Sequence, residues 1–198
     1  MSLKRFSNLI EVGCDEAGRG SLSGPVVAAA VILPSNFTNN DLNDSKKISK
    51  KKRDELSKII KENALAYEIG IVNPVEIDRI NILNASILAM HIAIDKIKIN
   101  FELLLIDGPY FRNYKDKTHK CIIRGDSQFQ AIAAASIIAK TYRDQLMIEL
   151  HNDFPEYKWS NNKGYPTREH KKAIENFGIS AHHRKSYKLV NNQMILEI

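Results

Sequence analysis

The chain has 198 residues, of which 43% are hydrophobic and 26% charged, a composition typical of globular rather than disordered proteins. Its 29 Lys and Arg against 23 Asp and Glu give a net charge of +6, which favours an anionic partner such as nucleic acid. The longest apolar run, residues 26–33, is far shorter than the ~20 residues of a membrane helix. With two cysteines, Cys14 and Cys121, and no signal-like start, we expect a reduced, cytoplasmic, monomeric protein without membrane association.

The pattern of apolar residues predicts strands and helices that alternate along the chain. Their expected ranges are 9–15, 26–33, 65–72, 102–106 and 121–124 for strands, and 48–62, 73–99 and 128–151 for helical segments. The region from about residue 153 to 198 is expected to form a small helical extension packed on the sheet. This order predicts an α/β protein, with a mixed sheet flanked by helices in one domain over residues 1–198.

A glycine-rich stretch with two acidic residues follows the first predicted strand. Asp15 and Glu16 end the apolar run, and the sequence continues AGRGSLSGP, in which glycines let the backbone approach a ligand closely. Because neighbouring strand residues point to opposite faces, we expect the two carboxylates to share a site only if the strand ends or bulges there. The same composition also suits a charged hairpin end with tight turns.

Two further acidic residues lie at the ends of predicted elements. Asp107 follows the fourth strand, where Asp-Gly is also common turn chemistry, and Asp126 precedes the Ala-rich helix, where it also suits an N-cap. Ligands collect beyond the carboxyl ends of strands in such sheets, so we expect Asp15 and Asp107 at one site. Such carboxylates suit Mg²⁺ or Mn²⁺, and two such ions can promote displacement at a phosphodiester.

The run DEAGRGSLSGP at residues 15–25 resembles the signature of type 2 ribonucleases H, specifically of bacterial ribonuclease HII. Further blocks resemble those of the family in the same order, and together they extend from about residue 9 to 187. They are DSKK at 44–47, IDG at 106–108, GDS at 125–127, IAAASIIAK at 132–140, RD at 143–144, KGYPT at 163–167, His170 and HRKS at 183–186.

The resemblance implies a ribonuclease H-like fold with a five-stranded mixed sheet. It implies an endonuclease that hydrolyses the RNA strand of RNA–DNA hybrids and incises duplex DNA 5′ of single embedded ribonucleotides. It further implies two divalent ions, Mn²⁺ or Mg²⁺, and products with a 3′-hydroxyl and a 5′-phosphate. We therefore expect a role in ribonucleotide removal during DNA replication and repair.

Four carboxylates are carried over by motif as catalytic and metal-binding residues: Asp15, Glu16, Asp107 and Asp126, with Asp15 expected to bridge the two ions. Asp144 is the alternative for the fourth place. It stands beside Arg143 in the long helix, where a surface ion pair or a supporting role is the simpler interpretation. We favour Asp126 because it matches the Gly-Asp-Ser block ahead of that helix.

The resemblance also implies a set of substrate-binding residues: Gly18, Arg19, Gly20, Ser45, Lys46 and Tyr165. The Gly-Arg-Gly segment resembles the family element that reads the ribose 2′-hydroxyl through backbone groups, and that hydroxyl is the only local mark of RNA within DNA. Tyr165 resembles the tyrosine that packs on the following deoxyribose.

A basic stretch begins the first predicted helix. Ser45 and Lys46, with the turn that Ser49 is expected to cap, are predicted to contact the nucleic-acid backbone. Family members often carry an acid after this serine, whereas Lys50 here leaves a cationic helix start. Farther along, His183 beside Arg184 is interpreted as a surface residue or as part of the phosphate path.

Two alternatives to a ribonuclease HII have to be weighed. A nucleic-acid-binding module would keep this fold without the chemistry, but all four acids are present. Ribonuclease HIII carries an extra N-terminal domain, which we do not expect because the glycine-rich block begins by residue 13. Type 1 ribonuclease H shares the fold but lacks the DEAGRGSLSGP run.

Overall fold

A computed structural model describes residues 3–42 and 48–189 of the chain. Its centre is a five-stranded sheet with the strand order β3-β2-β1-β4-β5. The strands are β1 (Glu11–Ala17), β2 (Val26–Ile32), β3 (Ala66–Val72), β4 (Leu103–Asp107) and β5 (Thr118–Ile122). β1 pairs antiparallel with β2 and parallel with β4, which confirms the mixed sheet predicted from the sequence.

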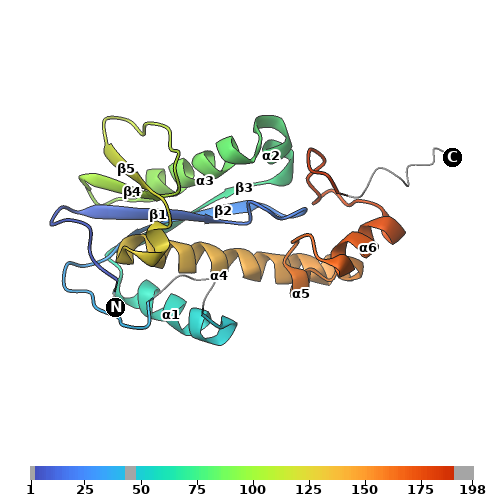
Figure 1. Ribbon diagram of the computed structural model, residues 1–198, viewed down its shortest axis with the longest axis horizontal. Coiled ribbons are helices and arrows are strands. Elements are labelled where there is room, and N and C mark those ends of the chain that lie inside the picture. Colours follow the sequence, from blue (N-terminus) through green and yellow to red (C-terminus); the bar gives the residue numbers. More distant parts are fainter. Residues whose placement is uncertain (1–2, 43–47, 190–198) are drawn as a thin grey trace.

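Helices cover both faces of the sheet (Figure 1). One face carries α1 (Lys50–Asn63) and α4 (Gln130–Asp153), and the other carries α2 (Pro74–Ile80) and α3 (Ile82–Lys96). β2 reads VVAAAVI and is buried along its whole length, as expected for a strand covered on both sides. Two short helices, α5 (Trp159–Asn162) and α6 (Arg168–Phe177), follow α4 at one end of the molecule.

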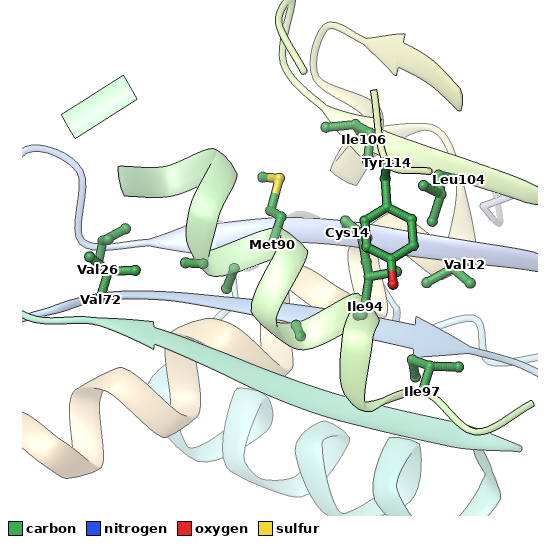
Figure 2. Close-up of a cluster of buried hydrophobic side chains, with 14 of the residues drawn as sticks. Val12, Cys14, Val26, Val72, Met90, Ile94, Ile97, Leu104, Ile106 and Tyr114 are labelled. Atoms are coloured by element: carbon green, nitrogen blue, oxygen red, sulfur yellow. The ribbon is translucent and has the colours of Figure 1, made fainter. Parts of the chain in front are cut away.

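Each face of the sheet has its own hydrophobic core. On the α3 side, Val12 and Cys14 of β1 and Leu104 of β4 pack with Met90 and Ile94 of α3 (Figure 2). The core on the opposite side is built largely from the alanines of α4. Alternate residues of β1 therefore point into different layers of the molecule.

The packing of α4 on β1 depends on one glycine. A Cβ added at Gly13 would overlap the backbone of Ala131 and Ile132, so no larger residue fits between strand and helix here. This close approach fixes the height of α4 above the carboxyl end of β1.

Several predicted elements differ from those observed. The helical segment expected at 73–99 is divided, because Asn81 adopts a φ of 65° and caps α3 by accepting a hydrogen bond from the Asn84 amide. β1 begins and ends two residues later than the predicted strand 9–15, and β5 spans Thr118–Ile122 rather than 121–124. No helix in residues 3–42 or 48–189 is long and apolar enough to cross a membrane.

Candidate active site

The carboxyl ends of β1 and β4 meet at the centre of the sheet. The chain leaves β1 toward β2 and leaves β4 toward β5, so the two connections diverge and leave a crevice between these strands. The pairing of β1 with β4 stops at Cys14 and Ile106, whereas β1 continues beside β2 as far as Ala17. The last residues of β1 therefore extend beyond the end of β4 and border an open notch.

Asp15, Glu16 and Asp107 line a pocket of about 370 Å³ at this notch. The expectation that β1 must end or bulge for its two acids to share a site is wrong, because β1 stays in register with β2 through both residues. The strand that ends is β4. The Asp15 side chain contacts Ser136 on the α4 side, whereas Glu16 also lines a second pocket beside α3, so the two reach the notch from opposite faces.

The electrostatics of the pocket are dominated by converging negative charge. Asp15 is 5% exposed, and burial raises the pKa of its carboxyl well above the usual range. The charges of Glu16 and Asp107 raise that pKa further, while hydrogen bonds from Ser136 and from the Glu16 amide, at 2.7 Å, oppose the rise. Placing three carboxylates together costs free energy that a bound cation would offset.

The donor chemistry fits a hard divalent cation, because carboxylate oxygens are the ligands such ions prefer. Asp107 Oδ1 accepts a hydrogen bond of 2.7 Å from the Gly125 amide, which holds the turn η1 (Gly125–Ser127) against β4. Asp126 lies buried in that turn and is not among the residues that line the pocket. Within the described residues, no three acidic, His or Cys side chains are grouped closely enough to hold an ion as they stand.

Asp144, the alternative to Asp126, is engaged in a buried ion-pair network. Its Oδ2 lies 3.2 Å from a guanidinium nitrogen of Arg53, and its Oδ1 lies 2.6 Å from Nζ of Lys140. The predicted ion pair is therefore present, but it is buried rather than on the surface. It orients Lys140, which lines the carboxylate pocket.

The sequence analysis assigned no role to Ser136 or Lys140, although both lie in a family block. Each lines the pocket from α4. Together with Arg143 they occupy positions i, i+4 and i+7 of an otherwise Ala- and Ile-rich helix, which places them on one face. That polar stripe on an apolar helix is the signal that identifies them from sequence.

Two fully buried arginines, Arg143 and Arg184, hold the glycine-rich turn that follows β1. Both donate their hydrogen bonds to backbone carbonyls. The acceptors are Ser23, Pro25 and Lys163 for Arg143, and Arg19 and Gly24 for Arg184. Burial lowers the pKa of Arg143 to about 10, but the guanidinium stays charged at neutral pH and serves as a rigid fork for the backbone.

The predicted substrate residues Gly18, Arg19, Gly20 and Tyr165 all line the carboxylate pocket. The Tyr165 ring lies 5.4 Å from Lys140 Nζ and 5.4 Å from the Arg143 guanidinium carbon. Arg19 extends outward and its guanidinium lies 3.2 Å from the Glu16 carboxylate. The turn, the tyrosine and the carboxylates thus share one concave surface.

A buried histidine pair supports the segment that carries Tyr165. The Tyr165 carbonyl lies 3.0 Å from His170 Nδ1, and His170 Nε2 lies 3.0 Å from the Trp159 indole nitrogen and 3.2 Å from His183 Nε2. Since the indole can only donate, these bonds assign a neutral His170 with its proton on Nδ1. Burial lowers the pKa of His183 to about 4, so the surface or phosphate-path interpretation of this residue is wrong.

The basic helix start is only partly described. Ser45 and Lys46 lie outside the described residues. Ser49 caps α1 as predicted, since its hydroxyl accepts a hydrogen bond of 3.2 Å from the Lys52 amide. Lys50 forms an ion pair of 2.6 Å with Asp54 one turn later.

Comparison with known proteins gives a consistent result. The family model Ribonuclease HII matches residues 12–190. The ribonuclease HII of Parabacteroides distasonis is 55% identical over 187 residues, covering 94% of this chain and 94% of its own. That of Porphyromonas gingivalis is 53% identical over 190 residues, covering 95% of this chain and 94% of its own.

Solved structures show the same fold at lower identity. The ribonuclease H2 of Pyrococcus horikoshii OT3 matches with a TM-score of 0.75 at 22% identity, covering 90% of this chain and 94% of its own. A chain from the PCNA:RNase HII complex of Archaeoglobus fulgidus gives 0.73 at 23% identity, covering 93% and 98%. Bst-RNase HIII in complex with Mn²⁺ gives 0.68 at 17% identity, covering 90% and 67%. The chain belongs to the ribonuclease HII family and is a type 2 ribonuclease H, a nuclease of the hydrolase class.

Proposed function

We propose that this protein hydrolyses the RNA strand of RNA–DNA hybrids and incises duplex DNA 5′ of single embedded ribonucleotides, leaving 3′-hydroxyl and 5′-phosphate ends. The observation that carries the proposal is the convergence of Asp15, Glu16 and Asp107 on one pocket that also contains the glycine-rich turn. Membership of the ribonuclease HII family supports it. Such an activity suits ribonucleotide removal during replication and repair in the cytoplasm.

Two divalent ions, Mn²⁺ or Mg²⁺, are the proposed cofactors, held by Asp15, Glu16, Asp107 and Asp126. Such ions would supply positive charge to the attacking and leaving oxygens of the phosphodiester. The negative charge crowded around Asp15 supports this assignment, as does the relative described in complex with Mn²⁺. Asp126 needs only its turn to shift toward Asp107, to which the neighbouring Gly125 is already hydrogen-bonded.

The other pocket residues would bind and orient the substrate. Lys140, held by Asp144 at 2.6 Å, presents a cation opposite the carboxylates and would contact a phosphate beside the scissile bond. The Tyr165 ring, supported by His170, offers an apolar face to a sugar. A 2′-hydroxyl on that sugar would crowd the ring, which favours deoxyribose at this position.

The glycine-rich turn would read the 2′-hydroxyl of the ribonucleotide. A Cβ added at Gly20 meets nothing within 4 Å, so the backbone there borders open space. The Arg19 carbonyl accepts hydrogen bonds from Arg184, at 2.9 Å, and from the Tyr187 hydroxyl, at 2.7 Å, which holds the turn rigid. A rigid, side-chain-free backbone can hydrogen-bond a ribose hydroxyl without first being ordered.

The proposal is tested with a DNA duplex carrying one ribonucleotide, incubated with Mg²⁺ or Mn²⁺, and with product ends mapped. An all-DNA duplex of the same sequence is the control. We expect a single incision 5′ of the ribonucleotide and a loss of at least ~100-fold in rate for Asp15→Asn and Asp126→Asn.

Asp144→Asn separates the two candidates for the fourth carboxylate. This variant removes charge from the Arg53–Lys140 network, so its rate must be compared at equal folded fraction, measured by circular dichroism. Retained cleavage by Asp144→Asn, with none by Asp126→Asn, supports the proposed assignment. Salt-sensitive binding of the duplex by the wild type without incision under either ion would instead identify a binding module.

A further inference from the structure

A second hollow lies outside the carboxylate pocket, between α1 and α4. Its volume is about 420 Å³, and its walls carry Lys50, Lys58 and Lys61 from α1 and Thr141 and Tyr142 from α4. We call it the α1–α4 groove. It contains none of the carboxylates assigned to the ions, and none of the residues assigned to the 2′-hydroxyl or to Tyr165.

The groove carries uncompensated positive charge. Its two acids are already neutralised, since Asp54 pairs with Lys50 at 2.6 Å and Asp144 pairs with both Arg53 and Lys140. Lys58 and Lys61 form no ion pair with any residue that the structure describes. An anion entering the groove therefore meets two ammonium groups without first displacing a carboxylate.

One polar group of the groove also lacks a partner. Thr141 Oγ1 is buried and has no hydrogen-bond partner among the described residues. A buried hydroxyl without a partner costs roughly 1–3 kcal/mol, which a ligand oxygen would recover. The neighbouring Tyr142 is 38% exposed and offers a ring beside it. Cations, a hydroxyl and an aromatic ring together suit a sugar–phosphate backbone.

The groove and the carboxylate pocket share a wall. Lys140 lines the pocket, Asp144 lines the groove, and the 2.6 Å ion pair between them joins the two. Along α4, the distance from Lys140 to Ile148 at the far side of the groove is ~12 Å, at 1.5 Å per residue. This corresponds to ~4 base pairs of a duplex at 3.4 Å per pair.

We propose that the α1–α4 groove binds backbone phosphates of the substrate duplex a few base pairs from the cleavage site, through Lys58 and Lys61. The inference rests on the proposed function for its choice of ligand. It adds a second, purely electrostatic anchor, which holds the duplex on one side of the ribonucleotide only. The carboxylate pocket recognises the site to be cut, while the groove supplies affinity that depends on salt and on duplex length.

The test measures duplex binding by fluorescence anisotropy, without divalent ions, for wild type and for Lys58→Gln/Lys61→Gln. The control is Lys98→Gln/Lys120→Gln, which removes the same charge from residues that do not line the groove. On a long duplex with a central ribonucleotide, we expect the groove variant to bind about tenfold more weakly and the control to bind as the wild type does. Its plot of log affinity against log salt should be shallower by ~1.8, at 0.9 per phosphate lost.

Duplexes shortened to about 3 base pairs on one side of the ribonucleotide complete the test. Shortening on one side should abolish the difference between wild type and groove variant, and shortening on the other side should leave it. Equal affinities and equal salt slopes on every duplex, or the same loss in the control variant, would overturn the inference. Cleavage of the shortened duplexes is scored separately, so that a wild type that binds but never cuts refutes the proposed function and leaves the groove supported.

Discussion

Gly18 is the residue at which the backbone conformation and the packing of the binding turn can be separated by mutation. Its φ is +97°, and a Cβ added there would overlap the Arg143 guanidinium. Gly108 has almost the same φ, +98°, but a Cβ there meets nothing within 4 Å. Gly20 has neither a positive φ nor a neighbour within that distance. Alanine at these three positions therefore imposes strain plus overlap, strain alone, and neither.

The magnitudes follow from these differences. A positive φ costs an L-residue roughly 1–2 kcal/mol, so we expect Gly108→Ala to lower the free energy of unfolding by about that amount. Gly18→Ala must in addition displace Arg143, which donates to three carbonyls at 2.9 to 3.1 Å. Each buried acceptor left without a donor costs roughly 1–3 kcal/mol, so we expect a total loss of about 3–5 kcal/mol. Gly20→Ala should stay within about 0.5 kcal/mol of wild type.

Urea unfolding followed by circular dichroism measures all three variants under one set of conditions. The order expected is Gly20→Ala, then Gly108→Ala, then Gly18→Ala, with a gap of at least ~1 kcal/mol between the last two. Equal losses for Gly18→Ala and Gly108→Ala would show that displacing Arg143 costs nothing. The account of this arginine as the support of the turn would then be wrong.

Three further predictions concern charge. Because the pKa of Asp15 is raised, its ionised form is disfavoured in the folded protein, and stability without metal falls as the pH rises from the usual carboxyl range toward that raised pKa; Asp15→Asn should therefore unfold at higher urea than wild type at pH 7 with chelator present. Mn²⁺ at ~100 times its dissociation constant should raise the wild-type free energy of unfolding by about 2.7 kcal/mol, and calorimetry that finds the same gain in Asp107→Asn would contradict the ion assignment. Since the pKa of His183 is lowered to about 4, folding opposes its protonation, so stability is lost as the pH falls from about 6.5 toward 4; allowing for solvent screening we expect a loss of about 1–2 kcal/mol, reduced in His183→Gln.

The sequence predicts the sheet and the position of its carboxylates well. Alternating strands and helices require a layered α/β arrangement, and Asp15 and Asp107 follow apolar runs that form adjacent parallel strands. The geometry of the two neighbouring acids on β1 was not predictable. Whether both reach one pocket depends on where β4 ends beside them, and register between distant strands is set by packing rather than by local sequence.

The supporting residues were also beyond sequence reasoning. Arg143 and Arg184 look like surface cations in the sequence, yet both are buried and bonded to backbone carbonyls far along the chain. Asn81 divides a helical segment because its own side chain caps the next helix, which a hydrophobic pattern does not reveal. Each of these roles depends on which backbone groups the fold brings within hydrogen-bond distance.

The anchoring of the glycine-rich turn has a consequence for the order in which the protein matures. The turn is completed by segments near the end of the chain: the Leu22 amide donates to the Gly164 carbonyl at 2.7 Å, and the Gly24 amide donates to the His182 carbonyl at 2.8 Å. At ~5–20 residues per second, a ribosome takes roughly 10–30 s to travel from this turn to its last partner. During that interval the strands can pair, but the binding surface lacks its supports. A nascent chain therefore acquires its fold before its nuclease site, and the site becomes organised only as synthesis ends.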